Sequence, residues 1–129
     1  MVKKGLLAAV VLCLAPVSVS AQSVMAEYAA YIGPQDMVNS SGQRLSGLCV
    51  MVQQDRANYH RFNRRDGADG FDPVFADRTL RGRIVNTCEL TQSGRNIDAH
   101  VRKGNPVFVS VRVLDDGGQM RVIVSELAG

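Results

Sequence analysis

One stretch, QQDRANYHRFNRRDGADGFDP (Gln53–Pro73), gathers most of the acidic, basic and aromatic residue types that the sequence contains. Within it, Arg56 and His60 are one helical turn apart, so their side chains can meet on a helix surface. A second histidine, His100, follows in IDAHVR. Two histidines and an arginine can act as acid, base and phosphate clamp in a metal-independent nuclease. We therefore keep a small hydrolase using His60, His100 and Arg56 as an alternative function.

Arg56 raises a second question, because a helical wheel places it near the centre of the apolar face. Asp55 lies toward one side of that face and His60 at its edge. A charged side chain that faces a core is unfavourable unless it is paired. Asp55, Arg56, Tyr59 and His60 thus form either a polar binding site or a structural cluster. We favour the second, in which Arg56 holds a loop carbonyl or carboxylate, because arginine often makes such contacts.

The loop after this helix carries Asp66, Asp69 and Asp72 among glycines. Calcium requires several oxygen ligands on a tightly turning backbone. However, the spacing of the acids and the intrusion of Pro73 depart from the known calcium-loop pattern, and Asp-Gly pairs also form ordinary turns. We predict no metal, with Asp66, Asp69 and Asp72 as an alternative calcium loop.

Familiar catalytic and cofactor motifs are missing from the sequence. It contains no nucleophile elbow, H-E-x-x-H, C-x-x-C, haem-attachment motif or phosphate-binding glycine loop. We predict no cofactor and favour a protein that is not an enzyme.

The first residues, MVKKGLLAAVVLCLAPVSVSAQS, place two lysines before an apolar run that small residues follow. With Val19 and Ala21 at the spacing that signal peptidase accepts, residues 1–21 are predicted to be a secretory signal peptide. The apolar run is shorter than the roughly 20 residues of a bilayer span, so we expect no membrane anchor after cleavage. Residues 22–129 then form a single small domain, periplasmic or secreted.

Removal of the signal peptide changes the charge and the cysteine count. Lys3 and Lys4 are two of the 15 basic residues, against 12 acidic ones, so the mature chain carries only one more basic than acidic residue. Its charge therefore does not indicate a nucleic-acid partner. Cys13 also leaves. Cys49 and Cys88 remain as a pair in an oxidising compartment, which predicts a disulfide between them.

A helix is expected to begin at Ser40, which has Gln43 at the spacing of a capping box, and to end near Asn63. Its polar side carries Gln54 and Asn58. Its apolar face is formed by Leu45, Leu48, Cys49, Met51, Val52, Tyr59 and Phe62. Before this helix, residues 24–32 are compatible with a short helix or an edge segment.

From about Leu80 the apolar residues recur at alternate positions, which is typical of strands. This pattern predicts about four strands, of which the last two form a hairpin. The strands are expected in RGRIVNTCEL, NIDAHVR, NPVFVSVRVL and QMRVIVSEL. The fold class is therefore α+β, with one main amphipathic helix on an antiparallel β-meander, braced by the disulfide. Both faces of the hairpin are apolar, Phe108 lying opposite the valines, so this hairpin could bind an unknown protein partner.

The segment between Tyr31 and Phe75 resembles a pattern in small exported bacterial proteins of unknown function. The resemblance lies in the runs YIGPQDMVNSSGQRL, QQDRANYHRF and DGFDPVF. The resemblance implies export and carries no activity or ligand. The sequence thus predicts an exported binding or structural module, with the hydrolase as the alternative.

Overall fold

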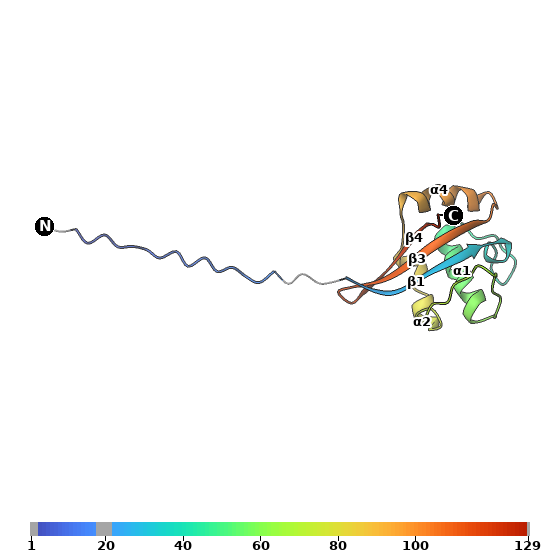
Figure 1. Cartoon of the computed structure of the whole chain (residues 1–129), viewed down its shortest axis with the longest axis horizontal. Helices are drawn as coiled ribbons and strands as arrows, with labels where there is room; N and C mark the ends of the chain where they lie inside the picture. The colour runs from blue at the N-terminus through green and yellow to red at the C-terminus, as the bar shows by residue number, and fades with distance from the viewer. Residues whose placement is uncertain (1–2, 18–21, 129) are drawn as a thin grey trace.

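The structure, a computed structural model, describes residues 3–17 and 22–128. Its elements are, in chain order, β1 (Gln22–Ile32), the 3₁₀ turn η1 (Pro34–Asp36), α1 (Leu48–His60), α2 (Arg78–Arg81), α3 (Ile84–Thr87), β2 (Cys88–Leu90), α4 (Gln92–Arg102), β3 (Val107–Asp116) and β4 (Gln119–Glu126). The strands form one sheet in the order β1-β3-β4-β2, and its three long strands are seen in Figure 1. The predicted α+β class is confirmed, and the sheet has four strands as expected, although β1 takes the place of the strand predicted at residues 96–102. The pairing is antiparallel except between β2 and β4, which are parallel.

The predicted hairpin is formed by β3 and β4, joined at Gly117 and Gly118, which both have positive φ. Alternate residues of β3 point into the core, where Val109, Val111 and Val113 have no exposed surface. Residues 24–32, for which a short helix or an edge segment was expected, belong to β1. This strand forms an edge of the sheet and pairs with the other side of β3.

Two segment predictions are wrong. Residues 96–102 belong to α4 instead of a strand, because Ile97 and Val101 are one helical turn apart and both enter the core. Thr91 begins this helix by accepting the Gly94 N–H at its hydroxyl. Most of RGRIVNTCEL is also non-strand, with only Cys88–Leu90 in β2.

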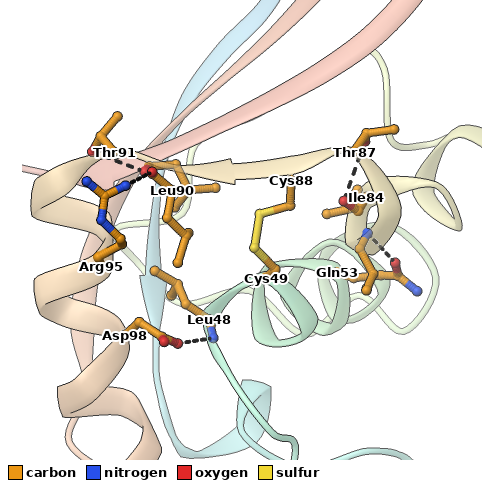
Figure 2. The surroundings of a disulfide bond; sticks show 12 residues. Leu48, Cys49, Gln53, Ile84, Thr87, Cys88, Leu90, Thr91, Arg95 and Asp98 are labelled. Atoms are coloured by element: carbon orange, nitrogen blue, oxygen red, sulfur yellow. Dashed lines mark hydrogen bonds between the residues drawn. A yellow bond between two sulfur atoms is a disulfide. The ribbon is translucent and has the colours of Figure 1, made fainter.

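The helix predicted from Ser40 begins at Leu48 instead. Asn39 explains the difference, since its Oδ1 accepts the backbone N–H groups of Ser41 and Gln43, each at 2.9 Å, and closes a turn there. The first turn of α1 is capped from a distance: Leu48 N–H donates to Asp98 Oδ1 of α4 at 2.8 Å (Figure 2).

The predicted disulfide is present between Cys49 at the start of α1 and Cys88 at the start of β2. Figure 2 shows this bond joining the helix to the short edge strand. Together with the Asp98 cap, it fixes the first turn of α1 against both β2 and α4.

Residues 3–17 of the predicted signal peptide are exposed and form neither a helix nor a strand. The predicted cleavage site at Ala21 lies outside the described residues. Within the described part of the chain, no helix has the length and apolar character needed to cross a membrane.

Candidate functional site

Arg56 of α1 is fully buried at the centre of a closed polar cluster. Its Nε donates to Asp55 Oδ2 at 2.7 Å, and its Nη1 donates to Asp72 Oδ2 and to Gly70 O, each at 2.9 Å. Both carboxylates are almost completely buried as well. Arg56 therefore holds a loop carbonyl and a loop carboxylate, as the structural interpretation of the sequence requires.

Aromatic rings enclose the Arg56 guanidinium. Its central carbon lies 4.1 Å from the centre of the Tyr28 ring of β1 and 4.4 Å from that of Tyr59. Arg65 covers Tyr59 in turn, at 4.0 Å. These distances are within the range of cation–π attraction. The cluster therefore joins α1 to β1 as well as to the loop.

Asp72 receives hydrogen bonds from several directions. Its Oδ1 accepts the N–H groups of Val74 and Phe75, and its Oδ2 contacts His60 Nε2 at 2.7 Å. Burial acts to raise the pKa of Asp72, but the hydrogen bonds from Phe75, His60 and Arg56 outweigh it and lower that pKa. Asp72 is thus held as a carboxylate and fixes both the loop and the His60 ring.

Asp55 has a different environment, since its Oδ1 is buried with no hydrogen-bond partner among the described residues. Burial raises the pKa of Asp55, and the neighbouring Arg56 opposes this rise. Burial likewise raises the pKa of Tyr28, whose hydroxyl also has no partner among the described residues. Because these groups are enclosed, no solute reaches them in this conformation. The predicted cluster of Asp55, Arg56, Tyr59 and His60 is assembled. Of these four residues only His60 is partly exposed to solvent.

The candidate calcium loop has its carboxylates bound to the protein itself. Asp69 accepts the N–H groups of Tyr31 and Asp66, at 2.9 and 2.8 Å. Asp66 accepts the Gln35 amide at 3.1 Å. No group of three potential metal-ligating side chains occurs in the described residues. These acids fasten the loop to the edge of β1 and to η1.

On its other side α1 carries Asn58, which the sequence places on the polar face and which is nevertheless buried. Its amide donates to Asp36 Oδ1 at 2.9 Å and to Gln35 O at 3.2 Å, and its Oδ1 accepts from Gln54 at 3.0 Å. Asp36 also accepts the Gly33 N–H, at 3.1 Å. Burial raises the pKa of Asp36 to about 6, although the hydrogen bonds from Asn58 and Gly33 oppose the rise. This network fixes η1 against the helix.

Between η1, the turn at 38–44 and α1 lies a cavity of about 400 Å³, which we call the amide-lined cavity. It is lined by Gln35, Val38, Asn39, Ser40, Gly42, Gln54, Asn58, Phe62 and Arg64. Gln54, Asn58 and Phe62 follow one another at intervals of four residues, so they form one stripe of the helix and its extension. Phe62, predicted to face the core, is instead 40% exposed here.

Hydrogen bonds hold the segments that border the cavity. Val38 and Arg44 form a β-bridge, and Gly42 takes a positive φ of 76° in the turn between them. Arg44 donates to the carbonyl of Arg102 at 3.0 Å, which attaches the turn to the end of α4. At the end of α1, Asn63 has a φ of 52° and Arg64 N–H donates to Asn58 O at 2.7 Å, so the backbone ends the helix and places Arg64 beside the cavity that it lines.

His100 lies elsewhere, exposed on α4. It lines a second cavity of about 340 Å³ with Ile97, Asn105, Pro106, Val107, Phe108, Glu126 and Leu127. His60 lines neither this cavity nor the amide-lined one. Arg56 is enclosed, so neither described cavity assembles the two histidines and Arg56 that the hydrolase alternative requires.

Phe108 is 49% exposed on the outer face of the sheet, where its ring lies 5.0 Å from that of Tyr31. Leu127, beside it, is 39% exposed. A protein partner at the C-terminal hairpin stays a prediction.

The buried cluster is predicted by the sequence, whereas the amide-lined cavity is not. The helical wheel places Gln54 and Asn58 opposite the apolar face, and their spacing of four residues was the available signal. What the pattern cannot show is that η1 and the turn at 38–44 fold back over that side. These two segments turn a polar helix face into a cavity wall.

Comparison with known proteins adds no relative: no protein-family model, curated protein or solved structure matches the chain.

Proposed function

We propose that this chain is an exported, non-enzymatic binding module and that the amide-lined cavity is its binding site for a small polar ligand. The observation that supports this most directly is the set of hydrogen-bonding atoms without partners at the cavity. Gln35 Oε1, Gln54 Oε1 and Ser40 Oγ make no hydrogen bond with any other described residue. The volume, about 400 Å³, lies within the range of about 300–1,000 Å³ typical of small-molecule sites.

The walls of this cavity are preorganised, which favours binding over simple hydration. Asn58 is held by Asp36, and Gln35 by Asp66, so these amides do not have to be ordered when a ligand binds. The Cys49–Cys88 disulfide, which anchors α1, fits a protein that works in an oxidising compartment. Export itself rests on the signal-peptide pattern of residues 1–21.

The test is an amide-resolved NMR titration of the exported, oxidised protein with hexoses, free amino acids, short peptides and nucleosides. We expect at least one of these probe classes to shift the amide signals of Ser40, Gln54 and Asn58 in a saturable way. Gln54→Trp should fill the cavity and abolish the shifts, whereas Asn86→Ala, which changes an exposed amide on α3, should leave them intact. Saturable shifts confined to other surfaces, or none with any probe, would contradict the proposal.

A further inference from the structure

The amide-lined cavity has three chemical properties that restrict its ligand. It offers hydrogen-bond acceptors on Gln35 and Gln54, aromatic surface on Phe62 and a positive charge on Arg64. Arg64 is exposed and makes no ion pair or side-chain hydrogen bond with another described residue. No acidic side chain is among the lining residues. The cavity therefore suits a ligand with several hydroxyl groups, an apolar face and a negative charge.

We infer that the ligand of the amide-lined cavity is an acidic saccharide, whose carboxylate pairs with Arg64 and whose hydroxyls donate to Gln35 and Gln54. This inference rests on the proposed function and names its ligand class.

Hydroxyl recognition follows from the hydrogen-bond inventory of the cavity. Asn58 directs its amide to Asp36 and accepts from Gln54, so the Gln54 side chain is held with Oε1 still available. Gln35 is held in the same way, because its amide nitrogen donates to Asp66. Two fixed carbonyl oxygens can accept further hydrogen bonds, and Ser40 can serve as donor or acceptor. Neighbouring hydroxyls on one ring supply donors at adjacent positions, whereas a free carboxylate supplies none.

Phe62 adds the apolar component. Phe62 lines the cavity and is 40% exposed as a residue, and the electron-rich face of its ring attracts the slightly positive C–H groups of a sugar ring. Arg61 already lies 4.9 Å from the ring centre, and this contact steadies the side chain. A sugar ring has polar groups around its edge and C–H groups on its faces, so it satisfies the amides and Phe62 together.

Arg64 distinguishes an acidic sugar from a neutral one. A guanidinium pairs with a carboxylate through two parallel N–H donors, and such a charge-assisted bond is about twice as strong as a neutral one. The backbone N–H of Arg64 donates to Asn58 O, which holds this residue beside the cavity. The Arg64 side chain remains available to pair with a ligand.

The experiment is a calorimetric titration of the exported, oxidised protein with matched probes. Glucuronic acid is compared with glucose, and galacturonic acid with galactose, since each pair differs only at the terminal carbon. At least one acid should bind about tenfold or more tightly than its parent sugar. Arg64→Gln should reduce its affinity to that of the parent, and Arg83→Gln, which removes an exposed charge outside the cavity, should change neither.

Further probes identify the source of the sugar and the competing ligands. A galacturonic acid oligomer that binds more tightly than the monomer would assign the site to polysaccharide chains, and equal binding would assign it to free sugar acids. Both results support the inference. Equal affinity for acid and parent sugar, or binding of phosphate or trialanine as tight as that of the sugar acid, would overturn it. If nucleosides or amino acids bind in the cavity and no sugar does, the ligand class is wrong and the binding function stands. If nothing binds, both fail.

Discussion

Replacement of Arg56 by alanine is the most direct test of how the second half of α1 is held. The change leaves two buried carboxylates, Asp55 and Asp72, without the guanidinium that pairs with both at 2.7 and 2.9 Å. Removal of one partner from a buried ion pair costs about 3–5 kcal/mol. Each of the two ring contacts contributes a further ~0.5–2 kcal/mol, but protonation of Asp55 relieves part of the loss. We expect the free energy of unfolding to fall by about 3–5 kcal/mol.

The assay is urea unfolding of the oxidised protein at pH 7. Arg83→Ala is the control, because Arg83 is exposed and its side chain makes no hydrogen bond or ion pair with a described residue. We expect this control to lie within about 0.5 kcal/mol of the wild type. If Arg56→Ala lies there too, Arg56 does not face the core and the account of the cluster is wrong.

A double-mutant cycle separates the ion pair from general loss of packing. Asp72→Asn keeps Oδ1 as an acceptor for the N–H groups of Val74 and Phe75 and removes the charge that Arg56 neutralises. Arg56→Ala combined with Asp72→Asn should therefore cost less than the sum of the single changes, by at least about 1 kcal/mol. Strict additivity would show that the two side chains do not interact.

Two further predictions concern the disulfide and Asp36. The chain from Gln22 onward should show no free thiol from Cys49 or Cys88 under denaturing conditions, and two reactive thiols would contradict the bridge. The 39-residue separation means that reduction should lower the free energy of unfolding by about 4 kcal/mol. The pKa of Asp36 is raised from 3.8 to about 6, so the folded state binds the carboxyl proton of Asp36 more tightly than the unfolded state does. The stability that this proton contributes is fully present below about pH 4 and is lost as the pH rises through 6. Urea unfolding across this range should therefore show the wild type losing about 3 kcal/mol relative to Asp36→Asn, and parallel curves would show that Asp36 is not buried against Asn58.

The parts of the fold that could be predicted depend on local patterns. The β3–β4 hairpin follows from alternating valines and a glycine turn, and the disulfide follows from the pair of cysteines that remains after the predicted signal peptide. The inward position of Arg56 follows from the helical wheel. In each case the signal lies within a few residues or in a simple count.

The errors arose where a distant contact decides between two local possibilities. Ile97, Ala99 and Val101 alternate like a strand, but the first and last also lie one helical turn apart. α4 packs so closely that Gly94 has no room for a side chain against Val124 O. Ser40 and Gln43 have the spacing of a capping box, yet Asn39 closes a turn there. The helix begins eight residues after Ser40, at Leu48, where Asp98 of α4 caps it. Neither partner can be identified before the tertiary structure is known.

Helix α1 buries polar side chains on two opposite sides. Arg56 fastens the loop at 70–72 on one side, and Asn58 fastens η1 on the other. Only the second network includes residues that line the amide-lined cavity. Loss of Arg56 should therefore lower global stability and leave the shape of the cavity in the remaining folded molecules, whereas loss of the Asp36–Asn58 bond should release η1 and weaken ligand binding at a smaller cost in stability. Stability and binding are thus separable in this helix, because its buried polar groups serve two different loops.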